Sequence, residues 1–513
     1  GTASNTFSLT VAAPPPATQA IASTALTRNV AATSFTPVTG SGGVAPLSYS
    51  VSPALPTGLS MASASGAVTG TPTVTSGATT YTVTVTDANG GTGTATFSLT
   101  VNAPPSATQA IASTVLTQNT AATSFTPVTG SGGTAPLAYS VSPALPTGLS
   151  MASASGAVTG TPTATSGATT YTVTVTDANS ATATATFSLT VNAAPSATQA
   201  IASTSLTRNT AAASFTPVTG SGGTTPLAYS VSPALPTGLS MASSTGAVTG
   251  TPTATSGATT YTVTVTDANG ATASATFSLT VNAAPSATQA IASTVLTRNT
   301  AATSFTPVTG SGGTTPLAYS VSPALPTGLS MASASGAITG TPTVASAATT
   351  YTVTVTDANG ATATATFSLT VNGAVTATQT VASKSLTVNT AATSFTPVTG
   401  SGGTSPLAYS VSPALPTGLS MASASGAVTG TPTATAVTTT YTVTVTDANS
   451  ATATATFSLT VNAAVTATQA VASTVLTRNA AATSFTPVTG SGGTAPLAYS
   501  VSPALPTGLS MAS

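Results

Sequence analysis

Very few side chains in this sequence could carry out chemistry. Its 513 residues include five Lys or Arg and five Asp or Glu, no His and no Cys, with a formal net charge of zero. The acids are all aspartates, and they recur every 90 residues: Asp87, Asp177, Asp267, Asp357 and Asp447. General acid–base catalysis needs His or a tuned carboxylate, and glycoside hydrolysis needs two carboxylates together. We therefore predict no catalytic site, no enzymatic activity and no cofactor.

Nucleophiles are present, but the groups that would activate them are not. Ser and Thr are abundant, yet no His and no Glu stands ready to deprotonate them. Zinc sites lack their usual His and Cys ligands. Lys384 is the only lysine, so a lysine–asparagine cross-link cannot recur from repeat to repeat.

Calcium is the metal that deserves a separate test. The segment Asp87-Ala88-Asn89-Gly90 could supply one carboxylate and one amide oxygen, and it recurs at the other four aspartates, with Ser180 and Ser450 in place of the glycine in two copies. Ca²⁺ takes six to eight oxygen ligands, commonly from several carboxylates. We expect instead that each aspartate caps its turn by accepting backbone N–H groups in an Asx-type arrangement. No metal site is predicted, and Asp87, Asn89 and the equivalent aspartates are the only calcium candidates.

Composition excludes several other classes of protein. Charged residues make up 2% of the chain, against about 25% in an average globular domain. Without clustered Lys and Arg, capture of nucleic acid through its phosphates is excluded. No run approaches the roughly 20 apolar residues of a membrane-spanning helix, so we expect no membrane insertion in this segment. Without cysteines the domains must be held by packing and hydrogen bonds alone.

A strict internal repeat determines the domain organisation. Met61 recurs as Met151, Met241, Met331, Met421 and Met511, with no insertion or deletion in the 90-residue period. We expect residues 1–12 to be the last strand of a preceding domain and the polypeptide to continue on both sides. The predicted repeats are 13–102, 103–192, 193–282, 283–372, 373–462 and, in part, 463–513.

Alternation of apolar residues with Thr or Ser identifies the strands of one period. It predicts strands at Thr80–Thr86 and Thr94–Val101, joined by a hairpin loop at Asp87–Gly91, and further strands at Leu47–Val51 and Ser34–Val38. Helical spacing of apolar residues is absent.

Shorter strands near Ile21, Leu59–Met61 and Val68 raise the number of strands to about seven. This predicts an all-β tandem array of immunoglobulin-like antiparallel sandwiches. We expect these side chains to face the core of the first complete repeat: Phe35, Tyr49, Val51, Tyr81, Val83, Val85, Phe97 and Leu99. Tyr81 would form either a tyrosine corner, with its hydroxyl bonded to the backbone, or a simple core contact.

Several segments resemble a known family. Leu55–Met61, Ser65–Pro72, the strand around Tyr81 and Asp87–Gly90 resemble the putative Ig domain of bacterial surface proteins (He-PIG), which is related to dystroglycan-type cadherin-like domains. The resemblance implies an immunoglobulin-like fold in a large extracellular or cell-surface protein of bacteria. Ala62 stands where such domains often have Asp or Asn, so the resemblance supports no calcium-binding role.

The many Thr and Ser residues have three interpretations. They are suited to the wettable outer face of a sheet, because Thr has a high β propensity. They could carry O-linked glycans, whereas no N-x-Ser/Thr sequence is present. Rows such as Thr82, Thr84 and Thr86 could instead bind ice or another crystal, although a twisted sheet is a poor match for a flat crystal surface.

These observations favour a structural role. We expect a component of an extracellular or cell-surface fibre that provides length and mechanical continuity. Short linkers such as Asn102–Ser106 should keep the six domains end to end in an extended rod about 200 Å long. Nearly uncharged rods should associate with one another into filaments or a sheath. The alternative is the stalk or ligand-binding region of an adhesin that recognises glycan or protein.

Overall fold

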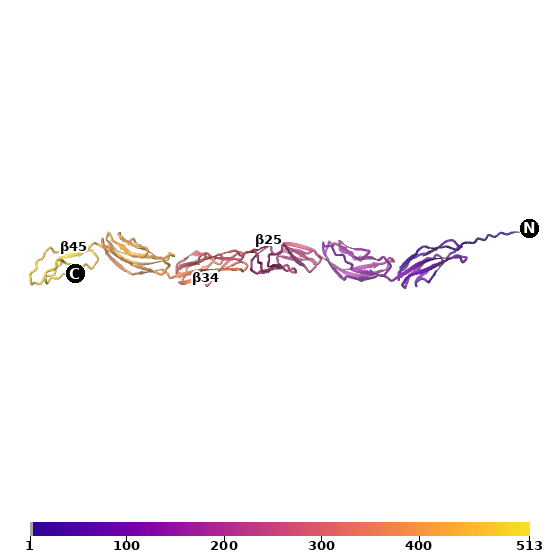
Figure 1. Cartoon of the computed structure of the whole chain (residues 1–513), viewed down its shortest axis with the longest axis horizontal. Helices are drawn as coiled ribbons and strands as arrows, with labels where there is room; N and C mark the ends of the chain where they lie inside the picture. The colour runs from indigo at the N-terminus through magenta and orange to yellow at the C-terminus, as the bar shows by residue number, and fades with distance from the viewer. Residues whose placement is uncertain (1–3, 513) are drawn as a thin grey trace. The chain divides into compact units, whose positions relative to one another are not determined.

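The computed structural model describes residues 4–512, and within that range the secondary structure is entirely β-strand (Figure 1). No helix in these residues is long and apolar enough to cross a membrane. Contacts divide the chain into two compact units. The first holds the residues up to 204, 213–250 and 258–279, and the second holds 205–212, 251–257 and the residues from 280 onward. Repeats 1 to 5 denote residues 13–102, 103–192, 193–282, 283–372 and 373–462.

Repeat 1 contains nine strands, two more than the sequence suggested. They are β1 (Ala17–Gln19), β2 (Ser23–Thr27), β3 (Ala32–Phe35), β4 (Val38–Gly40), β5 (Ser48–Ser52), β6 (Leu59–Met61), β7 (Val68–Gly70), β8 (Ser76–Thr86) and β9 (Thr92–Asn102). The long hairpin β8–β9 and strand β5 lie where alternation predicts them. The number is higher because two predicted strands, near Ile21 and at Ser34–Val38, each correspond to two short strands, β1 with β2 and β3 with β4.

The later repeats reuse this series of strands. Repeat 2 has β10 (Ser106–Gln109), β11 (Ser113–Thr117), β12 (Val128–Ser131), β13 (Ala138–Ser142), β14 (Leu149–Met151), β15 (Val158–Gly160), β16 (Ser166–Thr176) and β17 (Thr182–Asn192). Repeat 3 has β18 (Ser196–Gln199), β19 (Ser203–Thr207), β20 (Ala212–Phe215), β21 (Val218–Ser221), β22 (Ala228–Ser232), β23 (Leu239–Met241), β24 (Val248–Gly250), β25 (Ser256–Thr266) and β26 (Thr272–Asn282). Repeat 4 has β27 (Ser286–Gln289), β28 (Ser293–Thr297), β29 (Ala302–Phe305), β30 (Val308–Ser311), β31 (Ala318–Ser322), β32 (Leu329–Met331), β33 (Ile338–Gly340), β34 (Ser346–Thr356) and β35 (Thr362–Asn372). Repeat 5 has β36 (Thr376–Gln379), β37 (Ser383–Thr387), β38 (Ala392–Phe395), β39 (Val398–Ser401), β40 (Ala408–Ser412), β41 (Leu419–Met421), β42 (Val428–Gly430), β43 (Ala436–Thr446) and β44 (Thr452–Asn462), and β45 (Thr466–Gln469) and β46 (Val488–Ser491) follow it.

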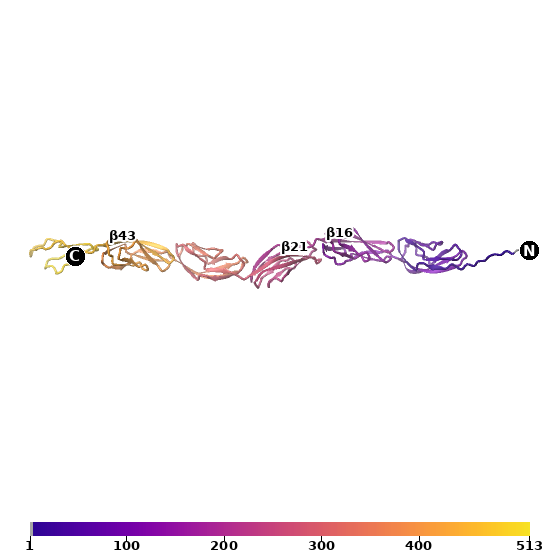
Figure 2. The same ribbon diagram turned by 90° about the horizontal axis from the view of Figure 1, so that it is seen from above.

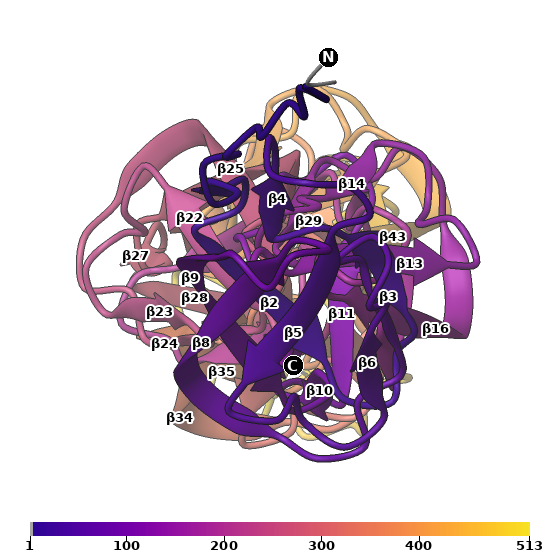
Figure 3. The same cartoon turned by 90° about the vertical axis from the view of Figure 1, so that its right-hand side faces the viewer.

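Each repeat is a sandwich of two sheets. In repeat 1 the larger sheet has the order β2–β9–β8–β5, the smaller has the order β3–β7–β6, and β1 pairs with β4. Strands β2, β5, β8 and β9 of the larger sheet and β3 and β6 of the smaller sheet are labelled in the end-on view of Figure 3. The larger sheet recurs as β11–β17–β16–β13 in repeat 2, β28–β35–β34–β31 in repeat 4 and β37–β44–β43–β40 in repeat 5. The pairing of β2 with β9 is parallel, from Ser23 opposite Ser98 to Thr27 opposite Asn102, whereas β9, β8 and β5 are antiparallel.

The core of a repeat lies between its two sheets. On β8, Tyr81, Val83 and Val85 are buried while the Thr residues between them are half-buried, which is the two-residue period of a strand with one apolar face. Phe97 on β9 stacks on Tyr81 with ring centroids 5.5 Å apart and meets Phe35 of the smaller sheet edge-on at 6.3 Å. Fully burying one such side chain contributes about 1.5–3 kcal/mol.

The predicted inward-facing set is confirmed in this core. Leu99 is buried with the residues of β8, and Phe35, Tyr49 and Val51 are half-buried and pack against the same cluster. Figure 2 shows the strands of repeat 1 gathered into one sandwich from a second side.

Tyr81 takes the simpler of its two predicted roles. Within residues 4–512 its hydroxyl makes no hydrogen bond, and its ring stacks on Phe97, so it is a core aromatic and the tyrosine-corner interpretation is wrong. A tyrosine–backbone bond does exist, but it belongs to Tyr49, whose hydroxyl accepts the Gly40 N–H at 3.1 Å. Tyr81 is the sequence candidate because it lies two residues before Val83, which stands at the position of the inter-sheet Cys of immunoglobulin domains.

The chain segments outside the five repeats contain less strand. Residues 4–12 form no strand, and Phe7, Leu9 and Val11 are exposed. Residues 1–3 of the predicted strand at 1–12 lie outside the described residues. After residue 462, β45 and β46 pair with each other antiparallel.

Candidate functional site at the junctions between repeats

The aspartate of each hairpin loop organises its surroundings through hydrogen bonds. In repeat 1, Asp87 follows β8, and its Oδ1 accepts the N–H groups of Asn89 at 3.0 Å and Gly91 at 2.8 Å. Its Oδ2 accepts the N–H of Val44, from the loop before β5, at 3.1 Å. The expected Asx-type cap is therefore present, and it also ties two loops at the same end of the repeat together.

In repeat 2 the same carboxylate gains a fourth donor, which comes from repeat 1. Asp177 accepts the N–H groups of Asn179, Ala181 and Thr134, as Asp87 does from its own loops. In addition, the hydroxyl of Thr27, at the end of β2, donates a short hydrogen bond to Asp177 Oδ2. Both residues belong to the first compact unit, and they are 150 positions apart in sequence.

A second threonine completes the link. Thr134 is 7% exposed, and its Oγ1 lies 2.9 Å from Thr27 Oγ1 and 3.3 Å from the carbonyl oxygen of Leu26. Asn102, the last residue of β9, donates its Nδ2 to Thr134 Oγ1 at 3.0 Å. The end of repeat 1 therefore meets repeat 2 through both its β2 strand and its β9 strand.

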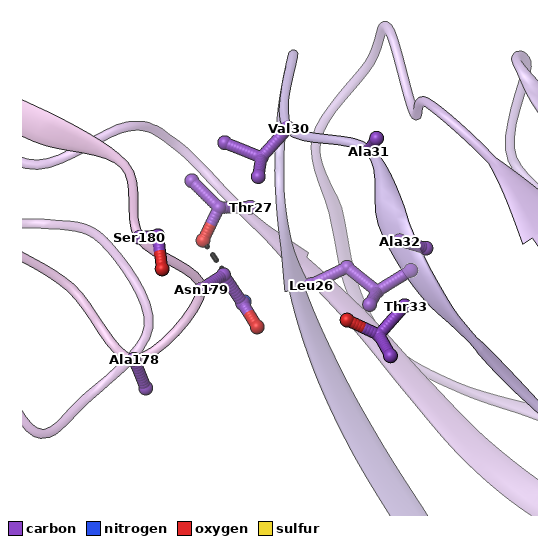
Figure 4. A pocket seen from close by; sticks show the side chains of 9 residues that line it. All are labelled: Leu26, Thr27, Val30, Ala31, Ala32, Thr33, Ala178, Asn179 and Ser180. Atoms are coloured by element: carbon purple, nitrogen blue, oxygen red, sulfur yellow. Dashed lines mark hydrogen bonds between the residues drawn. The ribbon is translucent and has the colours of Figure 1, made fainter.

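The loop asparagine closes the network. Asn179 Nδ2 lies 3.0 Å from the carbonyl oxygen of Ala25, 3.1 Å from Thr27 Oγ1 and 2.9 Å from Thr134 Oγ1. Figure 4 shows Asn179 reaching toward Thr27 across the boundary between the repeats, with Ala178 and Ser180 on either side of it. The hollow at this place is about 110 Å³, well below the roughly 300–1,000 Å³ of a typical small-molecule pocket. The junction therefore suits contact between repeats better than ligand binding.

The network recurs at three further junctions, one in the first compact unit and two in the second. Its members, in the order donor threonine, aspartate, second threonine and loop asparagine, are Thr117, Asp267, Thr224 and Asn269; Thr207, Asp357, Thr314 and Asn359; and Thr297, Asp447, Thr404 and Asn449. The strand-end asparagines Asn192, Asn282 and Asn372 bind Thr224, Thr314 and Thr404 at 3.2, 3.0 and 3.1 Å. We refer to each of these four-residue sets as a junction network.

Hydrogen bonding sets the charge state of the junction carboxylates. Burial of Asp177, which is 5% exposed, raises its pKa. The hydroxyl of Thr27 and the N–H groups of Thr134, Ala181 and Asn179 outweigh this effect, so the pKa of Asp177 lies below its ordinary value. Asp267, Asp357 and Asp447 follow the same pattern. Each junction therefore holds a carboxylate whose charge is stabilised by neutral donors.

The same geometry tests the calcium candidates. Both oxygens of Asp177 already accept two hydrogen bonds each, and Asn179 presents its Nδ2, a donor, to the junction. No group of three or more His, Cys, Asp or Glu side chains gathers anywhere in residues 4–512. Because Ca²⁺ needs six to eight oxygens, these residues do not fit a calcium site.

The sequence singled out the aspartates but missed their partners. Thr27 and Thr134 look like two of many strand and loop threonines, which were assigned to a solvated face, yet both are buried. A weak signal exists, because Thr27 directly follows the buried Leu26, so two consecutive side chains at the end of β2 avoid solvent. No pattern of apolar residues reveals a polar contact 150 positions away.

Comparison with known proteins agrees with this architecture. Residues 4–102, 104–192, 194–282, 284–372 and 374–462 each match the family model described as a putative Ig domain. No curated protein is significantly similar to the chain in sequence.

Similar solved structures are arrays of immunoglobulin or cadherin domains. An I-band fragment of titin is 14% identical, with 52% of this chain and 99% of that chain covered and a TM-score of 0.29. The immunoglobulin domains 1–5 of Sidekick-1 are 14% identical over 88% of this chain and 99% of that chain, with a TM-score of 0.29. The human Desmocollin-1 ectodomain is 13% identical over 88% and 98%, with a TM-score of 0.22. Likenesses of this size carry no functional argument.

Proposed function

We propose that this chain, which belongs to the putative Ig domain family, is a structural component of an extracellular or cell-surface fibre. In this proposal the repeats add length, and the junction networks hold each repeat to the next. The observation that carries the proposal is the recurrence at four junctions of one hydrogen-bond network built on a buried threonine–aspartate bond, with the same residue types in the same roles. A chain of independent domains would have no need to repeat such contacts.

The strand topology of a repeat supports a role under tension. In repeat 1 the chain enters through β1, which pairs with β4, continues into β2 and leaves at the end of β9. Strands β2 and β9 pair in parallel over five residue pairs, Ser23–Thr27 against Ser98–Asn102. Pulling the two ends apart loads these hydrogen bonds in shear, all together, instead of opening them one by one. Resistance of this kind is what mechanical continuity along a fibre requires.

The inventory of reactive groups supports a passive role. Each junction has a single carboxylate, and its pKa is lower than the ordinary value for aspartate, so it is a poor base. The sequence contains no His, Cys or Glu to assist it. We infer that the repeats themselves carry no catalytic activity.

Surface chemistry supports lateral association of these chains. The outer face of the larger sheet in repeat 1 pairs Thr82 with Thr96 and Thr84 with Thr94, and the whole chain has no net charge to keep copies apart. A weak contact repeated every 90 residues would add along the chain, as multivalent binding does.

Electron microscopy and light scattering of the purified chain at low and high salt test the fibre assignment. We expect bundles or filaments that persist as salt rises, because few charges are available for screening. Single chains at high protein concentration, or bundles that dissolve with salt, would contradict self-association. Specific capture of the chain on a glycan array, together with absence of assembly, would favour the adhesin alternative.

A further inference from the structure

The residue that follows the junction asparagine differs between repeats. Asn269 and Asn359 are followed by Gly270 and Gly360, whereas Asn179 and Asn449 are followed by Ser180 and Ser450. All four asparagines occupy the same position in the hairpin loop and hold the same three acceptors. The repeats therefore differ in one feature that controls a known reaction of asparagine.

That reaction is deamidation through a cyclic imide. The backbone nitrogen of the next residue attacks Cγ of the asparagine side chain, a C–N bond forms, and the side-chain nitrogen leaves as ammonia with the proton lost by the backbone amide. One water molecule then opens the resulting succinimide to aspartate or isoaspartate. A glycine offers the attacking nitrogen least steric hindrance, because it has no Cβ and adopts the widest range of backbone conformations.

We propose that Asn269 and Asn359 are sites of spontaneous deamidation and that Asn179 and Asn449 resist it. The proposal rests on the junction geometry and is independent of the fibre assignment. Modification at Asn269 would replace a donor by an acceptor at the carbonyl of Val115 and at two threonine hydroxyls. It would also bring a second negative charge next to the buried Asp267, so the modified junction should open.

Repeat 1 provides an internal reference for the unrestrained reaction. Asn89 is followed by Gly90, it is exposed, and no preceding repeat holds its side chain within residues 4–512. The Gly90 and Gly270 N–H groups both donate to the carbonyl of their loop aspartate at 3.0 Å, so the attacking nitrogen is held equally in the two loops. The loops differ in the junction, which fixes the Asn269 amide but not that of Asn89 within residues 4–512, and in the residue after the glycine, which is Gly91 in repeat 1 and Ala271 in repeat 3.

It follows that deamidation at Asn269 must proceed through molecules in which the junction is open. The ratio of the rates at Asn89 and Asn269 then reports how often that junction opens. A fourth Asn-Gly pair, Asn372-Gly373, lies in the linker, where Asn372 Nδ2 has the single acceptor Thr404. We expect the deamidation rate of Asn372 to be unaffected by changes at Asn269.

Ageing of the 513-residue chain in mildly alkaline buffer, followed by peptide mapping and isoaspartate detection, tests the proposal. We expect Asn89 to react fastest. Asn269 and Asn359 should react at about one tenth of the Asn89 rate or less, and Asn179 and Asn449 should be the slowest of the five. Hydrogen exchange should show lost protection of the Thr224 N–H in molecules modified at Asn269, because that N–H donates to Asp267.

Two variants make the result decisive. Gly270→Ser copies the loops of repeats 2 and 5 and should suppress reaction at Asn269 while leaving Asn359 unchanged. Thr117→Val should release the Asn269 amide and accelerate its reaction about tenfold toward the rate of Asn89, again without effect on Asn359. Equal rates at Asn269 and Asn179, or no reaction at Asn269 over a period in which Asn89 is consumed, would overturn the proposal. So would modification at Asn269 that leaves Thr224 protected.

Discussion

At the scale of single residues, the threonine that crosses each junction is the least expected and most consequential side chain. Thr27 is 1% exposed, and among residues 4–512 it supplies the one donor to Asp177 that comes from another repeat. A hydrogen bond to a charged group contributes about 1.5–3 kcal/mol to stability, and its loss leaves a buried carboxylate oxygen with one donor fewer. The contact therefore couples the charge of one repeat to the position of its neighbour.

Replacing Thr27 by Val keeps the shape of the side chain and removes the hydroxyl. We expect Thr27→Val to lower the free energy of local opening at the junction by about 1.5–3 kcal/mol, measured by hydrogen exchange at the Thr134 N–H. Thr27→Ser, which keeps a hydroxyl, should retain most of the protection. Equal protection in the Val variant and the parent chain would show that the bond contributes nothing.

A second prediction concerns backbone strain in the hairpin loop. Ser180 has a φ of +69°, where repeats 3 and 4 have Gly270 and Gly360 at +83°. A non-glycine residue in this conformation costs about 1–2 kcal/mol. Ser180→Gly should therefore stabilise repeat 2 by about 1 kcal/mol in thermal unfolding. Gly270→Ser is the matched reverse change, and because a Cβ there meets nothing within 4 Å, any loss of stability reports backbone strain net of the lower entropy of the unfolded chain, with no steric clash.

At the scale of elements, the sequence predicts what is periodic and misses what is not. Strands β8 and β9 contain the predicted segments Thr80–Thr86 and Thr94–Val101, in which apolar residues alternate with polar ones. Strands β1 and β4 are three residues long, so alternation cannot identify them. The aspartate cap was predictable because it uses N–H groups two and four residues away, whereas the Thr27 contact depends on the folding of two whole repeats.

The junction, taken as an element, should respond to acid. The pKa of Asp177 is lower in the folded chain than in the unfolded chain, where an aspartate titrates near 3.9. The carboxylate therefore contributes stability that is fully present above the unfolded pKa and is lost as pH falls through the folded pKa. Asp267, Asp357 and Asp447 should behave in the same way.

Hydrogen exchange as a function of pH measures this effect at the N–H of Thr134, which donates to Asp177 at 2.9 Å. After correction for intrinsic exchange, protection should be flat at neutral pH and fall only below about pH 4. Loss of protection nearer neutrality would contradict the assignment of a lowered pKa.

At the scale of the whole molecule, the account rests on repetition. Five matches to one family and four copies of one network mean that a small preference at each junction is multiplied along the chain. A chain with almost no charge has few other means of fixing one repeat against the next. The central claim is that the junction networks, and not the short linkers alone, hold neighbouring repeats together.

Imaging of single molecules by electron microscopy, with bend angles measured between neighbouring repeats, tests that claim most directly. The test variant combines Thr27→Val, Thr117→Val, Thr207→Val and Thr297→Val. Its control combines Thr92→Val, Thr182→Val, Thr272→Val and Thr362→Val, at exposed positions that begin β9, β17, β26 and β35. We predict that the test variant bends over a clearly wider range of angles than the parent chain, while the control does not. Identical angle distributions for the test variant and the parent chain would contradict the account.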